Sequence, residues 1–351
     1  MSVTEKLFGT INGVPTLEYC LKNKNGMEVD ILEWGAIITK IIVPDKNGNM
    51  VDVVLGHHKS ETYAENPGYF GATVGRCANR LEEGLIRING REYRSGINDG
   101  RNSLHGGIRG LDKRVWEAHP GGSKDEPEIT FLYVSPDGEE GYPGRVHIEV
   151  KFSLFNDNTL SINYFAMTNK ATVLNMTNHS YFNLGGYNSG AIDDHEIELE
   201  SSFFTPNNAE CMPTGEILSV ERRPFDMRMG KKFGEIFASN DEQIKMFGGL
   251  DHNFVIDGEG MRKCGSVYCH ETGIIMDCFT DMPGVQIYTA NMIDKGTKGK
   301  DGKSIKKHAA VCMETQYFPN AMKYLHFPSP ILKPGRKYNK TTMYRFSARD
   351  F

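Results

Sequence analysis

The stretch VHIEVKFSLFNDNTLSINYFA, residues 146–166, decides the fold class of this 351-residue chain. Apolar residues alternate with polar ones in both halves of the stretch, on either side of an Asn156-Asp157-Asn158 turn. Alternation with a period of two places one face of an extended segment in a core and the other face in water. Two such segments joined by an Asn/Asp turn predict an antiparallel β-hairpin.

Shorter segments with the same alternation recur along the chain, at residues 27–31, 197–199, 267–269, 275–279 and 285–287. Two runs rich in β-branched residues, 37–43 and 51–55, flank a turn at 46–49 and predict a second hairpin. The sequence lacks sustained helical periodicity, and its 38 glycines and 15 prolines suit a chain of many turns. We therefore expect an all-β fold, a large antiparallel β-sandwich in which residues 1–351 form a single domain, rather than parallel βαβ units.

Composition narrows the classes of partner. The formal net charge of −5 argues against a surface that binds nucleic acid. The first residues, MSVTEKLFGTINGVPT, lack the basic start and apolar run of a signal peptide, and no apolar stretch is long enough to span a membrane. Seven cysteines without a CxxC pair are typical of reduced thiols. We expect a soluble, cytoplasmic protein with no nucleic-acid or membrane partner.

Polar residues gather in NMTNHSYFNL, residues 175–184, which holds a histidine, a tyrosine and three asparagines. Buried polar groups must be paired, so such a run is costly unless its members bond to one another or to a ligand. It is either a polar turn at the edge of the sandwich or a site for a polyhydroxylated ligand around His179. His105, followed by Gly106 and Gly107, poses the same choice between a turn residue and the wall of a cleft.

Glu314 follows the apolar run 309–313 and precedes Thr315-Gln316. A carboxylate at the end of a buried strand has its pKa raised towards neutrality, which suits a general base. The alternative is a glutamate at the rim, paired with a lysine. The sequence lacks the usual motifs of metal sites, of serine hydrolases and of nucleotide-binding proteins: it has no HxH or HExxH, no GxSxG, no GxxxxGK[ST] and no GxGxxG. We expect no metal site.

Seven segments, in their order and spacing, resemble the successive motifs of the aldose 1-epimerases, the galactose mutarotases. They are FGATVGRCANR (70–80), NSLHGG with GLDKRVW (102–116), NMTNHSYFNL (175–184), GLDHNFVID (249–257), PGVQIYTAN (283–291), METQYFPNA (313–321) and FPSPILKPGRKYNKTTMYRF (327–346). The resemblance runs from near residue 8 to the C-terminus. It implies the same large antiparallel β-sandwich, and an isomerase that interconverts the α and β anomers of hexoses such as galactose and glucose.

The resemblance also implies the roles of individual residues. Glu314 is the base that removes the proton of the C1 hydroxyl, His179 is the acid that protonates the ring oxygen, and His105 hydrogen-bonds near that oxygen. The hydroxyl groups of the sugar are held by Asn79, Arg80, Asp251 and Gln286. No cofactor is required. The expected partner is a small-molecule aldose, and the expected assembly is a monomer or a weak homodimer.

Three aromatic residues keep two interpretations: Tyr181, Phe182 and Tyr317 either stack on a face of the sugar or pack against their neighbours. Cys77 stands where the family often has an aliphatic residue, and a small buried thiol is tolerated there.

Two other functions share this fold. An epimerase for hexose 6-phosphates would need an arginine cluster to hold the phosphate, and none is identified beyond the family pattern. A sugar-binding protein without turnover is the second alternative, and the presence of His105, His179 and Glu314 argues against it.

Overall fold

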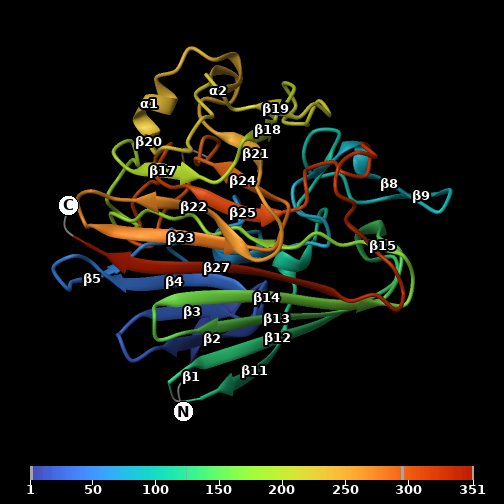
Figure 1. The fold of residues 1–351 in the computed structure, drawn as a ribbon. Coiled ribbons are helices and arrows are strands. Elements are labelled where there is room, and N and C mark those ends of the chain that lie inside the picture. The colour runs from blue at the N-terminus through green and yellow to red at the C-terminus, as the bar shows by residue number, and fades with distance from the viewer. Residues whose placement is uncertain (1–2, 124, 294–295, 350–351) are drawn as a thin grey trace.

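The computed structural model describes residues 3–123, 125–293 and 296–349, and strands dominate it (Figure 1). The α-helices of the described residues, α1 (Phe233–Phe237) and α2 (Glu242–Phe247), are each less than two turns long. Short 3₁₀ segments lie at η1 (Ser60–Ala64), η2 (Glu82–Gly84), η3 (Leu111–Lys113) and η4 (Glu139–Gly141). Within the described ranges, no helix combines the length and the apolar character that crossing a membrane requires.

The largest sheet has nine strands, each antiparallel to its neighbours. Their order is β11 (Glu117–Gly122), β12 (Pro127–Ser135), β13 (Val146–Leu154), β14 (Thr159–Thr168), β27 (Tyr338–Ala348), β23 (Ile274–Thr280), β22 (Arg262–Tyr268), β17 (Glu196–Leu199) and β20 (Lys231–Lys232). The last strand of the chain therefore joins two groups of strands that are far from it in sequence.

Two five-stranded sheets accompany the nine-stranded sheet. The first consists of β1 (Val3–Ile11), β2 (Val14–Lys22), β3 (Glu28–Leu32), β4 (Ile37–Pro44) and β5 (Met50–Asp52). The second has the order β19 (Leu218–Ser219), β18 (Phe203–Thr205), β21 (Asp251–Val255), β24 (Gly284–Tyr288) and β25 (Cys312–Gln316). The remaining pairs are β10 (Ser103–Leu104) with β7 (Arg80–Leu81), β15 (Thr172–Val173) with β26 (Ile331–Leu332), β16 (Thr177–Asn178) with β6 (Thr73–Val74), and β8 (Leu85–Ile88) with β9 (Arg91–Arg94).

Strands β13 and β14 form the hairpin that the alternation at 146–166 predicts. They pair antiparallel, with residues 146–154 opposite 160–168. Val146, Ile148 and Val150 are buried, whereas His147 and Glu149 between them are exposed. The prediction of the hairpin and of its buried face is confirmed.

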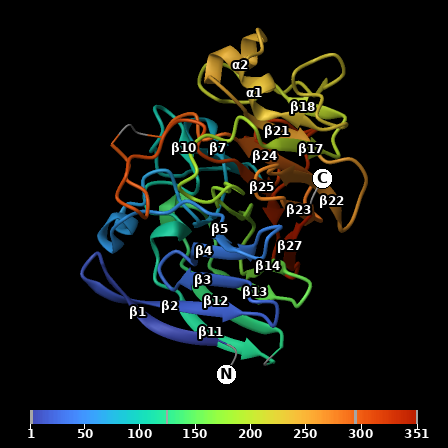
Figure 2. The ribbon, with the colours of Figure 1, turned by 90° about the vertical axis from the view of Figure 1, so that its left-hand side faces the viewer.

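The core of the sandwich lies between the nine-stranded sheet and the two five-stranded sheets. In Figures 1 and 2, β1–β5 lie beside the β11–β14 half of the large sheet, and β21, β24 and β25 lie beside the half with β17, β22 and β23. One cluster of buried apolar side chains joins all three sheets, for example Ile31, Phe152, Val267 and Ile287. Because burying apolar surface is the main favourable contribution to folding, this cluster holds the sheets together. The expected antiparallel β-sandwich is confirmed.

The second predicted hairpin is present as β4 and β5, with residues 42–44 opposite 50–52. The prediction that its second strand extends to residue 55 is wrong, because β5 ends at Asp52. The N–H of Val53 still donates to the carbonyl of Ile41 in β4, and the residues after Val53 bond to the polar segment 175–184. The N–H of Leu55 donates to the carbonyl of Tyr181, and Val54 forms a bridge with Phe182. The polar segment is thereby tied to the N-terminal sheet.

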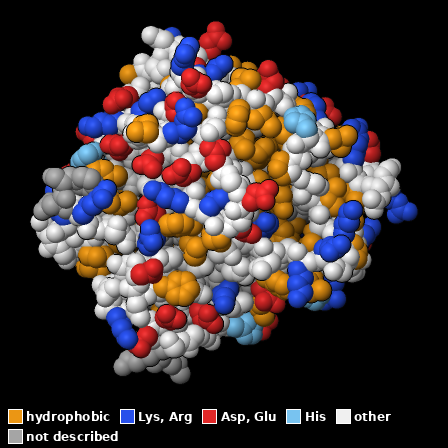
Figure 3. Space-filling view, in the orientation of Figure 1, with side chains coloured by type: hydrophobic (Ala, Val, Ile, Leu, Met, Phe, Trp, Pro, Cys, Tyr) orange, Lys and Arg blue, Asp and Glu red, His pale blue; other side chains and the backbone are white. Residues whose placement is uncertain are grey.

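The distribution of charged side chains and the state of the cysteines can be compared with what the composition predicts. Figure 3 shows basic and acidic side chains interspersed on one face, without a broad region of a single sign. All seven cysteines are free thiols, and five of them are buried.

Candidate active site

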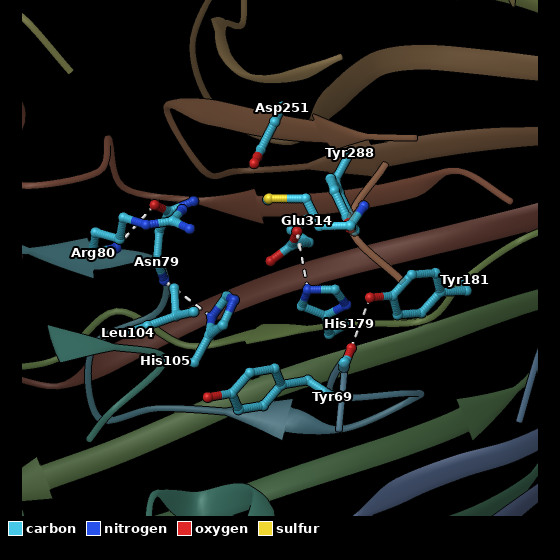
Figure 4. A pocket seen from close by; sticks show the side chains of 12 residues that line it. Tyr69, Asn79, Arg80, Leu104, His105, His179, Tyr181, Asp251, Tyr288 and Glu314 are labelled. Carbon is cyan, nitrogen blue, oxygen red and sulfur yellow. Dashed lines mark hydrogen bonds and ion pairs between the residues drawn. The ribbon is translucent and has the colours of Figure 1, made fainter. Parts of the chain in front are cut away.

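Segments that are far apart in sequence meet in one cavity beside the second five-stranded sheet (Figure 4). Asp251 begins β21, Tyr288 ends β24 and Glu314 lies in the middle of β25. Short strands and loops supply the other wall. The cavity is lined by Gly68, Tyr69, Asn79, Arg80, Leu104, His105, His179, Tyr181, Asp251, Tyr288, Met292 and Glu314. Six of the seven site residues expected from the sequence are in this set, and Gln286 is not.

Figure 4 shows the side chains of Glu314 and His179 pointing toward each other. Nε2 of His179 lies 3.5 Å from Oε1 of Glu314, and the two side chains are only 5% and 2% exposed. The backbone holds His179 in place, because its N–H donates to the carbonyl of Ala72 and its carbonyl accepts the N–H of Gly71. Glu314 is thus a buried residue facing an imidazole, and not a rim glutamate paired with a lysine.

Burial shifts the pKa values of this pair in opposite directions. The pKa of Glu314 is raised well above its usual value, because the carboxylate is buried and lies near Asp251, and Arg80 opposes this shift. Burial lowers the pKa of His179 to about 4. The imidazole is therefore neutral near neutral pH, and a single proton on the pair favours Glu314 over His179. A carboxylic acid and an imidazole so arranged can exchange protons with a bound molecule in either direction.

The backbone around His105 has an unusual conformation. His105 has a φ of 49°, and Gly106 and Gly107 follow with φ values of 98° and 108°. A Cβ atom at Gly106 would lie 1.9 Å from the carbonyl oxygen of Gly75, so only glycine fits there. This close approach places His105 at the cavity wall, which is one of the two alternatives that the sequence left open.

His105 and Asn79 bond to each other. The N–H of His105 donates to the carbonyl of Asn79 at 3.1 Å, and the N–H of Asn79 donates to Nδ1 of His105 at 3.2 Å. Since Nδ1 accepts, a neutral His105 carries its hydrogen on Nε2. Burial, with His179 and Arg80 nearby, holds the pKa of His105 well below its usual value. His105 is therefore a neutral hydrogen-bond donor.

Arg80 and Asp251 supply charge to the cavity wall. Nε of Arg80 donates to Oδ2 of Asp99 at 2.7 Å. Nε2 of Gln286 donates to Oδ1 of Asp251 at 2.7 Å, and burial raises the pKa of Asp251 despite the nearby Arg80. Gln286 lies opposite Glu314 in the sheet and supports Asp251 through this bond, and its Oε1 has no hydrogen-bond partner among the described residues.

The same three side chains could be considered as metal ligands. Ligand atoms of His105, His179 and Glu314 lie within 4.8 Å of one another. A metal ion needs a lone pair from each imidazole. The Nδ1 lone pair of His105 already accepts the N–H of Asn79, and its Nε2 carries the hydrogen. The arrangement therefore suits proton transfer better than metal coordination.

The sequence analysis did not single out five of the lining residues, Gly68, Tyr69, Leu104, Tyr288 and Met292. The ring centroid of Tyr69 lies 4.7 Å from that of His105. A period of two from Gln286 would have identified Tyr288, because the two residues lie on the same face of β24. No pattern in the sequence distinguishes Tyr69, Leu104 or Met292.

The structure distinguishes the positions of the three aromatic residues that had two interpretations. Tyr181 lines the cavity, and its hydroxyl donates to the carbonyl of Gly68 at 2.7 Å. Phe182 is fully buried in the main core, and Tyr317 packs against that core. Cys77 is buried in a smaller apolar cluster.

An all-β sandwich with a carboxyl group and an imidazole facing each other in a polar cavity defines an acid–base enzyme for a small polar molecule. Comparisons with known proteins give its family. The sequence profile described as Aldose 1-epimerase matches residues 18–345. The chain is 41% identical over 353 residues to the galactose mutarotase of Bos taurus, with 99% of each chain covered. It is 30% identical over 341 residues to the aldose 1-epimerase of Escherichia coli K12, covering 96% of this chain and 97% of that one.

Solved structures agree. A crystal structure of an aldose epimerase homologue from C. elegans has a TM-score of 0.87 at 30% identity, covering 94% of this chain and 98% of that one. A galactose 1-epimerase from Lactobacillus acidophilus has a TM-score of 0.88 at 25% identity, covering 99% and 98%. The chain belongs to the aldose 1-epimerase family, whose members are isomerases that interconvert the anomers of aldoses. The family and enzyme class implied by the resemblance are confirmed.

Proposed function

We propose that the protein interconverts the α and β anomers of hexoses such as galactose and glucose, with Glu314 and His179 exchanging the protons. The observation that carries this proposal is the 3.5 Å approach of His179 Nε2 to Glu314 Oε1 in a buried polar cavity. Relatives named galactose mutarotase in Bos taurus, Sus scrofa and Homo sapiens support galactose as a substrate.

Ring opening needs a base at the C1 hydroxyl and an acid at the ring oxygen. Both oxygens are bonded to the same carbon, so base and acid must occupy fixed positions close to each other. Glu314 removes the hydroxyl proton, the C1 carbonyl forms, the bond from C1 to the ring oxygen breaks, and Nε2 of His179 gives its proton to that oxygen. Rotation about C1–C2 presents the other face of the aldehyde. The reverse transfers then close the ring as the opposite anomer.

The pair holds one proton throughout this cycle. In the empty site the proton rests on Glu314, because burial lowers the pKa of His179 and raises that of Glu314. It moves to His179 before ring opening, returns to Glu314 in the open-chain intermediate, and is again on His179 after closure. No external proton is consumed, and the proposed cycle uses no cofactor.

The remaining polar residues hold the sugar. His105 donates its Nε2 hydrogen near the ring oxygen. Arg80 and Asn79 offer donors to the hydroxyl groups, and the carboxyl group of Asp251 offers acceptors. Gln286 orients Asp251 and keeps Oε1, which lacks a partner in the described part of the chain, for a hydroxyl.

The cavity disfavours a phosphorylated sugar. Arg80 is the one lysine or arginine among its described lining residues, and its Nε already donates to Asp99. Two carboxyl groups, those of Asp251 and Glu314, line the same cavity. A phosphate dianion is best held by several arginine donors. A protein that binds sugar without turnover would not need a base and an acid facing each other.

We also propose that the whole chain is one domain, acts in the cytoplasm, and is a monomer or a weak homodimer. The core cluster shared by all three sheets supports one domain. The free thiols support a reducing compartment. Sedimentation velocity and cell fractionation test the last two points.

Polarimetry of freshly dissolved α-D-galactose near neutral pH tests the activity. We expect the wild type to accelerate the approach to the anomeric equilibrium. Glu314→Gln keeps the shape of the side chain but cannot accept the proton, so it should lose on the order of 10²- to 10⁴-fold in rate. Glu149→Gln is the matched control, because Glu149 is exposed on β13. A wild type that only matches the buffer blank would overturn the proposal.

A further inference from the structure

Cys312 lies behind the catalytic pair, on the same strand as Glu314. Residues 312 and 314 are two positions apart on β25, so their side chains share one face of that strand. Cys312 is fully buried. Its Sγ lies 3.6 Å from Nδ1 of His179, within hydrogen-bonding range for sulfur. One strand therefore presents a carboxyl group to one side of the imidazole and a thiol to the other.

Each ring nitrogen of His179 thus faces its own partner on β25. Nε2 faces Glu314 Oε1 at 3.5 Å, and Nδ1 faces Cys312 Sγ at 3.6 Å. Tyr181 and Tyr288 lie beside the ring, with centroid distances of 5.0 Å and 6.3 Å. In such a dry setting, the tautomer of the imidazole depends on which nitrogen has an acceptor for its hydrogen.

We propose that Cys312 is a positioning residue whose sulfur accepts the Nδ1 hydrogen of His179, so that Nε2 is the nitrogen that exchanges a proton with the sugar. This inference rests on the proposed function of His179. During the cycle, Nε2 must lose its proton to the ring oxygen and later take it back. It can do so only if the hydrogen of the neutral ring stays on Nδ1. The thiol keeps it there without contacting the sugar.

A thiol suits this position better than a carboxylate. A carboxylate beside Nδ1 would favour the imidazolium and hold its proton too firmly. The thiol of Cys312 stays neutral, because burial and the nearby Glu314 and Asp251 raise its pKa well above the usual value. A neutral sulfur is a weak acceptor. It can select the tautomer and still leave His179 able to release its proton.

Nuclear magnetic resonance of the protein labelled with ¹⁵N-histidine tests the tautomer directly. The signals of His179 are assigned by comparison with His179→Asn. We expect the wild type near neutral pH to carry its hydrogen on Nδ1, and Cys312→Val, which has no acceptor, to shift it to Nε2. A wild-type ring with its hydrogen on Nε2 would overturn the inference. This measurement does not require enzymatic turnover, so a failure of this inference can be distinguished from a failure of the proposed function.

Kinetics of three variants provide the second test. Cys312→Ala and Cys312→Val should lower kcat about tenfold with little change in KM, the size expected when one buried donor loses its partner. The acid limb of their pH profile should move to lower pH, because the imidazolium has lost an acceptor. Cys278→Ala is the matched control, since it removes another fully buried thiol, on β23. A folded Cys312→Val with the wild-type kcat and pH profile would overturn the inference.

Discussion

Replacing Glu314 by aspartate keeps the charge and chemistry of the carboxyl group but shortens the side chain by one methylene. The carboxyl oxygen lies 3.5 Å from His179 Nε2 in the wild type, and removing one C–C bond of about 1.5 Å withdraws it to about 5 Å. The backbone cannot follow, because β25 is paired with β24 along its whole length. A displacement of this size costs about 10²-fold in rate, which corresponds to about 2.7 kcal/mol of activation free energy.

Polarimetry over a range of α-D-galactose concentrations measures this effect and separates kcat from KM. We expect the loss in kcat, with KM changed little, because the residues proposed to hold the hydroxyls are untouched. Glu314→Gln should lose at least as much, since it removes the base altogether. Glu149→Asp, on the exposed face of β13, controls for the shortening itself. A folded Glu314→Asp with the wild-type kcat would refute the reasoning, because the rate would then not depend on where the carboxylate lies.

Three further outcomes are expected. The rate should be highest at intermediate pH. Below about pH 4, His179 and Glu314 both hold protons and the base is lost, whereas above the raised pKa of Glu314 the pair holds no proton and the acid is lost. A pH profile without a fall on the alkaline side would contradict the shared proton. Dialysis against a chelator should leave the activity unchanged, because the Nδ1 lone pair of His105 is occupied; a loss that zinc restores would contradict this. Phe152→Ala, in the core, should lower the free energy of unfolding measured in urea by about 3–5 kcal/mol and leave kcat of the folded protein unchanged. A decrease in the free energy of unfolding of less than about 1 kcal/mol would contradict close packing around Phe152.

Local patterns predicted those parts of the fold that depend on neighbouring residues. The alternation at 146–166 predicted its hairpin because strand periodicity places successive side chains on opposite faces. The end of β5 at Asp52 could not be predicted in this way. It depends on bonds from Val54 and Leu55 to the distant segment 175–184, which the order of residues around 52 does not encode.

The sequence by itself determined the all-β class, the family through its ordered motifs, and Glu314 and His179 as candidates. Only the tertiary structure decided that these two side chains face each other, that Gln286 donates to Asp251, and that the sulfur of Cys312 meets the far side of the imidazole. The reason is physical. Proton transfer and pKa depend on burial and on distances between segments far apart in the chain, and the packing of three sheets around one core sets those distances.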